Sequence, residues 1–209
     1  MAVLRILGKA SSINVRKVLW TCEEIGIDYK QEDFGSGFAS TLTPDFLTLN
    51  PNGLVPVIET EDGVLWESNT ICRYLAAKYR RPDLLPADPW PRALVERWMD
   101  WQATELNGAW RSAFMGLVRK DPAFADPSLI ADSVRAWSAK MAILEQHLGA
   151  GSSFLVGDRL TLADIVIGLS INRWYQTPID HPEFLAVAAY WQLLKSRPAF
   201  QRGRFDAVP

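Results

Sequence analysis

The 209-residue sequence is poor in the residues from which metal centres and disulfide frameworks are built, since it has two cysteines and two histidines. Cys22 and Cys72 are far apart and neither belongs to a Cys-x-x-Cys motif, which excludes a disulfide framework and indicates a reducing, cytoplasmic setting. His147 and His181 are distant from both cysteines and from each other. We therefore expect no metal site and no serine–histidine–aspartate triad.

The sequence also lacks long apolar runs and an excess of either charge. No run approaches the ~18 apolar residues that span a membrane, and Met1–Arg5 does not have the layout of a secretion signal. The formal net charge is −2, and no basic stripe of the kind that binds nucleic acid is visible. With 48% hydrophobic and 22% charged residues, the composition is that of an ordinary globular protein. We expect neither membrane nor nucleic acid as a partner.

The first 80 residues alternate between strand and helix patterns. The patterns predict strands at 3–7, 29–33, 55–60 and 64–66, and helices at 15–25, from Thr43-Pro44 onward and at 68–79. The predicted order is β-α-β-α-β-β-α. Of nine tryptophans only Trp20 and Trp66 fall in this part, so the two halves of the chain are built differently.

Residues 81–91 contain four prolines, which remove amide donors and fix φ. We therefore predict an extended linker there, between a domain at 1–80 and a domain at 92–209. No strand pattern follows the linker. The second domain is predicted to be all-helical, with a long helix from Leu94 that bends near Gly108 or Gly116, a helix at 130–148, a capping box at Thr161–Asp164 before 165–171, and a last helix at about 183–196.

Two short segments carry polar groups suited to anions. Ser11, Ser12 and Asn14 lie between the first strand and the first helix, where they either cap the helix or donate to a bound thiolate or phosphate. Glu67 and Ser68 open a later helix, where Ser68 is either a cap or a donor to a substrate carboxylate, while Glu67 faces an ammonium.

Two further segments are less polar. A cis Val55–Pro56 bond would turn the backbone of Val55 outward to pair with an extended peptide. Trp110, Arg111 and Phe114 lie on the first long helix, where aromatic residues at this spacing belong either to a core or to a pocket wall. Cys22 and Cys72 lie on apolar helix faces and are expected to be packed thiols.

These segments occur together and in order, and the joint pattern resembles the cytosolic glutathione S-transferase superfamily over essentially the whole chain. The strings that carry the resemblance run over 12–18, 50–56, 67–75 and 157–165. Among its classes, the Ser-x-x-x-Arg-x-Val string is most similar to the bacterial serine-type enzymes of theta, delta or phi kind.

The resemblance implies a thioredoxin-like N-terminal domain (βαβαββα) followed by an all-α C-terminal domain, as a homodimer. It implies that glutathione is a cosubstrate and that no other cofactor takes part. It assigns thiol activation to Ser12, with Ser11 or Asn14 as alternatives, and pairing with the cysteinyl backbone to Val55 beside cis-Pro56.

The remaining site residues also follow from the resemblance. Glu67 and Ser68 would hold the γ-glutamyl end. Related classes have lysine, glutamine or histidine near positions 53–54 to hold the glycyl carboxylate, where this chain has Gly53 and Leu54, so Asn52 is the candidate. The electrophile pocket would be lined by Trp110, Arg111, Phe114 and Phe38.

Three functions fit this pattern. The first is detoxification by transfer of glutathione to a small hydrophobic electrophile. The second keeps the site but changes the reaction to peroxide reduction, dehalogenation or isomerisation. The third is a binding or regulatory protein of the same fold without catalysis, which the apolar Leu54 favours and the combination of Ser12, Val55 and Ser68 opposes.

Overall fold

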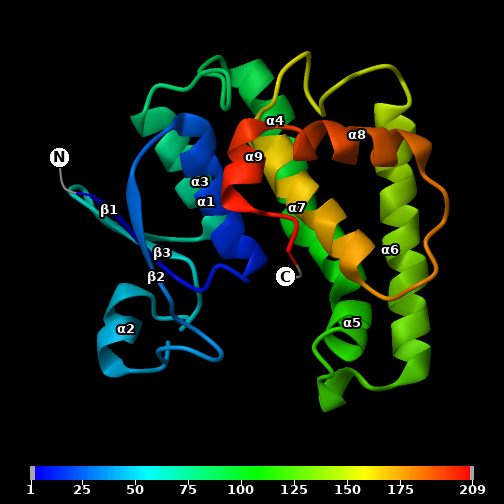
Figure 1. Ribbon diagram of the computed structural model, residues 1–209, viewed down its shortest axis with the longest axis horizontal. Coiled ribbons are helices and arrows are strands. Elements are labelled where there is room, and N and C mark those ends of the chain that lie inside the picture. Colours follow the sequence, from blue (N-terminus) through cyan, green and yellow to red (C-terminus); the bar gives the residue numbers. More distant parts are fainter. Residues whose placement is uncertain (1–2, 208–209) are drawn as a thin grey trace. The chain divides into compact units, whose positions relative to one another are not determined.

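The computed structural model describes residues 3–207 and divides them into two compact units. The first unit comprises the residues up to Pro86 together with Arg197–Ala207, and the second comprises Ala87–Ser196 (Figure 1). The first unit combines strands and helices. Within the described part of the second unit, all regular elements are helical.

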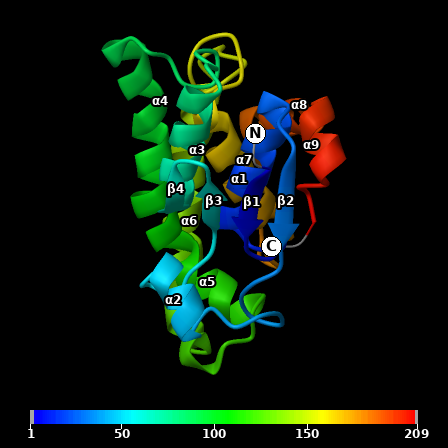
Figure 2. The same ribbon diagram turned by 90° about the vertical axis from the view of Figure 1, so that its left-hand side faces the viewer.

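The first unit is built on a four-stranded sheet. Its strands are β1 (Leu4–Leu7), β2 (Tyr29–Glu32), β3 (Val57–Thr60) and β4 (Gly63–Trp66). They lie in the order β2-β1-β3-β4, with β1 parallel to β2 and the other two pairs antiparallel (Figure 2). The helices are α1 (Ile13–Ile25), α2 (Pro44–Leu49), α3 (Ser68–Lys78) and α9 (Pro198–Gly203). This confirms the predicted order β-α-β-α-β-β-α.

Local signals set the helix ends of this unit. Gly26 ends α1 in the left-handed conformation (φ 81°), where glycine carries no steric cost. The Thr43 side chain accepts a hydrogen bond from the Phe46 amide, and Pro44 occupies the first turn of α2. The core between β1, β3 and α2 consists of Leu7, Phe46 and Val57.

The second unit contains α4 (Pro89–Trp101), a π-helix (Gln102–Leu106), α5 (Asn107–Leu117), a 3₁₀ turn (Pro122–Phe124), α6 (Pro127–Leu148), α7 (Leu162–Gln176) and α8 (Leu185–Lys195). Every residue of α7 from Leu162 to Trp174 is buried, so α7 forms the centre of this unit. The capping box at its start is confirmed, because Asp164 accepts hydrogen bonds from the Thr161 amide (2.7 Å) and hydroxyl (2.8 Å).

The structure corrects three expectations. Pro89 and Pro91 belong to the first turn of α4, where proline lacks only an amide that would have no helical partner, so the linker ends at Asp88. The linker is also not extended throughout, because the Leu84 and Leu85 amides donate to the Arg81 carbonyl (3.0 and 3.1 Å) in a turn. The long helix is interrupted by the π-helix at Gln102–Leu106 rather than at Gly108 or Gly116. A further helix, α9, follows the one that was predicted to be last.

The position of α9 has a clear physical cause. Phe200 and Phe205 pack on Trp20 of α1, with ring centroids 4.9 and 5.9 Å away. Arg197 donates two hydrogen bonds of 2.8 Å to Glu24, also on α1. These contacts attach residues 197–207 to the first unit.

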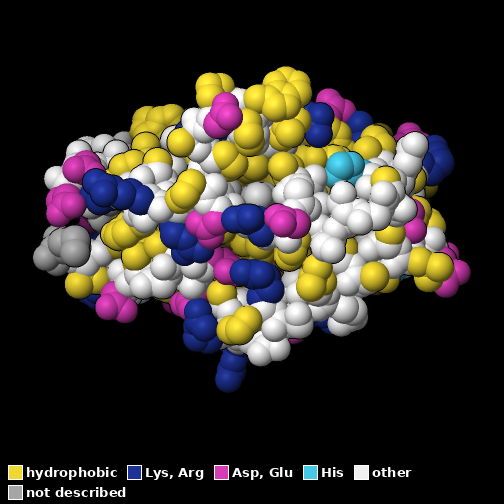
Figure 3. Space-filling view, turned by 90° about the horizontal axis from the view of Figure 1, so that it is seen from above, with side chains coloured by type: hydrophobic (Ala, Val, Ile, Leu, Met, Phe, Trp, Pro, Cys, Tyr) yellow, Lys and Arg dark blue, Asp and Glu magenta, His cyan; other side chains and the backbone are white. Residues whose placement is uncertain are grey.

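The described residues include no helix that could cross a membrane, and the face shown in Figure 3 has no large patch of side chains of one charge. Among residues 3–207, no helix combines the length and apolarity needed to cross a membrane. Basic and acidic side chains lie beside one another across the face in Figure 3.

Candidate active site

The strand register brings three candidate segments to one end of the sheet. Leu7, the last residue of β1, pairs with Val57, the first residue of β3. Val57 also pairs with Trp66, the last residue of β4. The loop after β1, the segment before β3 and the start of α3 therefore leave the sheet side by side.

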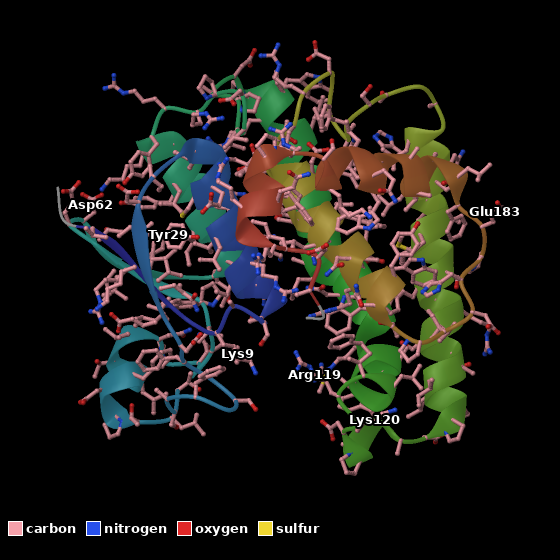
Figure 4. All side chains as sticks on the ribbon, viewed as in Figure 1. Lys9, Tyr29, Asp62, Arg119, Lys120 and Glu183 are labelled. Atoms are coloured by element: carbon pink, nitrogen blue, oxygen red, sulfur yellow. The ribbon has the colours of Figure 1, made fainter. Side chains whose placement is uncertain are left out.

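Close packing at Gly8 holds the first of these segments against the second. A Cβ at this position (φ 147°) would lie 2.5 Å from Val15 and 2.9 Å from Val55, so only glycine allows the approach. The loop that follows is tied to the segment after β2, because Lys9, labelled in Figure 4, donates its amide to Phe34 (3.1 Å) and its Nζ to the Ser36 carbonyl (2.9 Å).

Ser12 directly precedes α1, at the capping position, but its hydroxyl does not cap the helix. Its backbone amide donates to the Lys9 carbonyl (3.0 Å) and its carbonyl accepts from Arg16 (2.9 Å). No side-chain hydrogen bond of Ser11, Ser12 or Asn14 occurs within residues 3–207, and the first turn of α1 has no acidic residue. The capping interpretation is therefore wrong for the Ser12 hydroxyl, which stays half-buried beside the positive end of the helix.

The second segment presents a polar backbone. The Val55–Pro56 peptide bond is cis, as the resemblance implied. Pro56 is buried, and the Val55 side chain packs on the core cluster. Among the described residues, neither the amide nor the carbonyl of Val55 has a hydrogen-bond partner. An extended ligand backbone is the natural partner for such a pair of groups.

The loop before Val55 is shaped by Asn50. Its Oδ1 accepts from the backbone (3.0 Å) and side chain (2.9 Å) of Asn52, and its Nδ2 donates to the Leu54 carbonyl (2.8 Å). Gly53 adopts φ 61°, and a Cβ there would lie 2.9 Å from Leu42. Asn52 is exposed with one amide proton already engaged, whereas the Leu54 side chain is 63% exposed.

The third segment is strained. Glu67 directly precedes α3 with φ 74° and ψ 107°, a conformation that costs a non-glycine residue on the order of 1–3 kcal/mol. Its side chain is exposed. Ser68, the first residue of the helix, is buried, and its hydroxyl has no partner among the described residues. Capping by Ser68 is therefore wrong as well, because Glu67 occupies the capping position.

The candidate pocket residues of the second unit separate into two groups. Trp110 and Phe114 form an edge-to-face pair with centroids 5.5 Å apart, and the buried guanidinium of Arg173 from α7 lies 4.1 and 4.2 Å from their rings. Arg111 does not join them, since it is exposed and lies over Phe124 (5.7 Å).

Sequence reasoning missed Arg173. An arginine inside the apolar run of α7 was the available signal, since such a charge needs a special environment. Arg119 and Lys120, labelled in Figure 4, follow the end of α5, and Arg119 lies 5.4 Å from the Phe114 ring. Phe38 lies on the loop after β2 in the first unit and is 55% exposed.

The two cysteines are buried, and the two histidines are hydrogen-bonded to the backbone. Burial raises the pKa of Cys22 well above its usual range and that of Cys72 to about 11, so neither thiol is poised as a nucleophile. The Nε2 atoms of His147 and His181 each bond a backbone carbonyl. No group of three or more potential metal ligands occurs within residues 3–207.

Comparison with known proteins identifies the family. The model of the glutathione S-transferase N-terminal domain matches residues 2–77, and the model of the C-terminal domain matches residues 111–198. The chain is 36% identical to glutathione S-transferase GstB of Escherichia coli K12 over 202 residues, which are 96% of this chain and 97% of GstB. The chain belongs to the cytosolic glutathione S-transferase superfamily.

Solved structures agree with this assignment. The theta class glutathione S-transferase of Xanthomonas axonopodis pv. citri with glutathione bound is 40% identical and superposes with a TM-score of 0.92, with all of both chains covered. The thioredoxin-like N-terminal domain and the helical C-terminal domain are thereby confirmed as the fold. Elongation factor 1-gamma 1 of rice is also similar, with 30% identity over 210 residues, and the match covers 94% of this chain and 48% of that protein.

Proposed function

We propose that this protein is a glutathione transferase that ionises the glutathione thiol beside Ser12 and transfers the sulfur to a hydrophobic electrophile. One observation carries the proposal. Two hydroxyls at helix N-termini, those of Ser12 and Ser68, form no caps and lie at the same end of the sheet as the unpartnered backbone of Val55. The similarity to a theta class enzyme with glutathione bound supports the same function.

The chemistry needs little more than Ser12. A thiol with a pKa near 8.5 is only a few per cent ionised at neutral pH. Lowering that pKa by about two requires ~2.7 kcal/mol of preferential thiolate stabilisation. A hydroxyl donor to an anion supplies roughly 1.5–3 kcal/mol, and the N-terminus of α1 adds up to ~1 kcal/mol. The protein then needs no nucleophile of its own.

The remaining parts of the tripeptide bind to other residues at the same end of the sheet. Val55 pairs with the cysteinyl backbone, the Ser68 hydroxyl and amide hold the γ-glutamyl carboxylate, and the Glu67 carboxylate faces the ammonium. Asn52 remains the candidate for the glycyl carboxylate. In this proposal the first unit, the residues up to Pro86 together with Arg197–Ala207, binds glutathione, and the second unit, Ala87–Ser196, supplies the electrophile pocket; these bounds replace the predicted 1–80, 81–91 and 92–209.

The aromatic pair of Trp110 and Phe114 favours an apolar electrophile. We propose Arg173 in place of Arg111 as the arginine of the pocket wall, because its guanidinium lies over both rings. A buried cation there stabilises negative charge that develops on a nearby leaving group or oxygen.

We further propose that two copies associate in the cytoplasm. The second unit has a groove of about 480 Å³ between α4 and α6, and its lining includes Trp98, Trp101 and Ile143. Ile143 is 43% exposed and Trp90 on α4 is 73% exposed, apolar area that a second copy would remove from water. Light scattering after gel filtration tests this, with Ile143→Glu expected to yield monomers. A wild-type monomer would contradict it.

The decisive experiment for the function combines binding with turnover. Calorimetry measures glutathione binding, and a panel of aryl halide, alkyl halide, isothiocyanate and cumene hydroperoxide identifies the reaction. Conjugation of an aryl halide or isothiocyanate supports transfer, whereas activity with the peroxide or alkyl halide alone supports the alternative reactions. No binding at millimolar glutathione would refute the proposal and favour a non-catalytic module, the alternative suggested by the similarity to elongation factor 1-gamma.

A further inference from the structure

The junction between α4 and α5 contains a hydrogen-bond network centred on the side chain of Asn107. Its Oδ1 accepts from the Gln102 side chain (2.9 Å) and from the indole Nε1 of Trp110 (2.9 Å). Gln102 is fully buried and also donates to the Ser170 hydroxyl of α7 (3.0 Å). One amide oxygen thus joins the interior of the second unit to the half-buried ring of Trp110.

The π-helix brings Gln102 and Asn107 together. The Asn107 amide donates to the Gln102 carbonyl five residues earlier, which is the π-helical hydrogen-bond pattern. In an α-helix, five residues turn the chain by about 500°, so the two side chains would point about 140° apart. The π-helical turn instead places both on one side of the helix, where their amides bond. Such turns inside α-helices are frequent at functional sites.

The need to satisfy buried polar groups explains only the inner half of this network. Gln102 is fully buried, so its side chain needs partners within the protein. Trp110 is half-buried, so water could accept from its N–H group without Asn107. The indole N–H groups of Trp98 and Trp137 are buried and form no hydrogen bond within residues 3–207, so the fold does not depend on bonding every indole. The bond to Trp110 has another consequence, because it fixes the orientation of the ring.

The other contacts of the Trp110 ring agree with this role. Phe114 meets it edge-to-face with centroids 5.5 Å apart, and the Arg173 guanidinium lies 4.1 Å from its centroid. The hydrogen bond at Nε1 adds a directional contact to this packing, so the plane of the indole is set. The strength of aromatic stacking depends on the angle between the rings. An aromatic ligand therefore gains more from a fixed indole than a small aliphatic ligand does.

We propose that Asn107 is a positioning residue that gives the enzyme a preference for aromatic electrophiles, because it fixes the indole plane of Trp110 on which the ring of the electrophile packs. This inference rests on the proposed function, in which Trp110 belongs to the electrophile pocket. Residues of the first unit hold glutathione in that proposal, so glutathione binding does not depend on Asn107.

The test uses two thioethers, S-benzylglutathione and S-methylglutathione, of which only the first carries an aromatic ring. Calorimetry measures Kd for both, and their ratio isolates the contribution of the ring; KM is measured for an aryl halide and for glutathione. Asn107→Leu removes the acceptor at similar size, whereas Asn107→Asp keeps an acceptor oxygen. Ser170→Ala is the matched control, since it removes a bond of Gln102 at the far end of the network and leaves the Trp110 bond in place.

Asn107→Leu is expected to bind S-benzylglutathione about 3- to 10-fold more weakly than the wild type and S-methylglutathione equally tightly. The KM for the aryl halide is expected to rise by the same factor, with KM for glutathione unchanged. Asn107→Asp is expected to stay within about two-fold of the wild type for both thioethers. Ser170→Ala is expected to lower Tm by about 2–4 °C without altering the ratio.

An unchanged ratio of the two Kd values in Asn107→Leu overturns the inference. An equal loss in Ser170→Ala also overturns it, because the effect would then follow from stability alone, and so does an Asn107→Asp variant as weak as Asn107→Leu. Should Asn107→Leu fail to fold, Trp110→Phe removes the same bond from the other side and keeps an aromatic ring. Its preference for the benzyl group is expected to fall, and an unchanged preference would contradict the inference.

The wild-type protein separates the two proposals. If it binds neither thioether, the proposed function itself is wrong. If it binds both and Asn107→Leu has the same ratio, glutathione binding stands and only the role of Asn107 is refuted.

Discussion

The substitution Ser12→Ala separates a catalytic hydroxyl from a structural one. A serine directly before the first residue of a helix usually stabilises the helix through a side-chain cap, and its loss costs ~1 kcal/mol. The Ser12 hydroxyl makes no such bond. We therefore expect Ser12→Ala to leave the free energy of unfolding unchanged while it impairs the reaction.

The size of the kinetic effect follows from the one bond removed. A neutral donor to an anion contributes roughly 1.5–3 kcal/mol, so the pKa of the bound thiol is expected to rise by about 1 to 2. At a pH below the wild-type pKa of the bound thiol, the thiolate fraction, and with it kcat, is expected to fall by about 10- to 100-fold. The KM for glutathione is expected to change little, because in the proposed site Val55 and Ser68 still hold the tripeptide.

The assay pairs thiolate titration and aryl halide conjugation with thermal unfolding. Thr43→Ala is the matched control, because the Thr43 side chain does cap a helix of the same unit. It is expected to lower Tm by about 2–4 °C without altering the titration. Unchanged turnover in Ser12→Ala, Ser11→Ala and the double variant would refute hydroxyl activation, and so would a loss of activity in Ser12→Ala that follows from unfolding.

Two further predictions concern other parts of the first unit. Glu67→Gly relieves the strain of the positive φ, so Tm is expected to rise by about 2–4 °C, and a lower Tm would contradict the strain. The KM for glutathione is expected to rise about 2- to 5-fold, because the ammonium would lose the partner proposed for it. The pKa of Glu32 is lowered to about 2 by hydrogen bonds from Arg5 and Lys30, so this carboxylate stabilises the fold at neutral pH and the contribution is lost as the pH falls from 4.5 toward 2. Glu32→Gln is therefore expected to make Tm depend less on pH between 4.5 and 2. If Tm falls with pH in this range as steeply as in the wild type, the ion pairs of Glu32 with Arg5 and Lys30 do not stabilise the fold.

Much of the fold can be predicted from the sequence, because the residues that favour helix starts and ends stand where tertiary packing also places them. Gly26 ends α1 in the left-handed conformation, and Thr43 caps α2, as their residue types suggest. The π-helix and α9 were missed for a different reason. Their positions depend on tertiary contacts, such as the packing of Phe200 on Trp20, for which the local sequence has no period.

The candidate site likewise combines features that local sequence predicts with features that depend on tertiary contacts. Sequence reasoning proposes Ser12, Val55 and Ser68, but only the strand register shows that their segments leave the sheet together. Residue type alone suggests capping for both serines. The structure rejects that, because Glu67 occupies the capping position before α3 and the Ser12 hydroxyl makes no hydrogen bond to the helix. Arg173 could not be predicted as a ring partner, since α5 and α7 are far apart in sequence.

The absence of a cationic side chain beside the cis-proline has a structural cause at position 53. Gly53 has φ 61°, and a Cβ there would lie 2.9 Å from Leu42 and 3.3 Å from the Thr41 carbonyl, so any larger residue disturbs the loop. Position 54 is different. Its side chain is 63% exposed, and its backbone is held by Asn50 through the carbonyl, independently of residue type.

Leu54→Lys is therefore expected to supply the missing cation without a packing cost. An exposed ion pair with the glycyl carboxylate contributes about 0.2–1 kcal/mol, which corresponds to roughly 1.4- to 5-fold tighter glutathione binding. The gain should diminish with added salt, because exposed charges are screened. Calorimetry with glutathione and with its glycyl ethyl ester provides the test: the ester lacks the carboxylate, so Leu54→Lys should bind it no more tightly than the wild type does. Equal gains for both ligands would mean that the glycyl end of the tripeptide lies away from position 54, and that Asn52 has no carboxylate to hold.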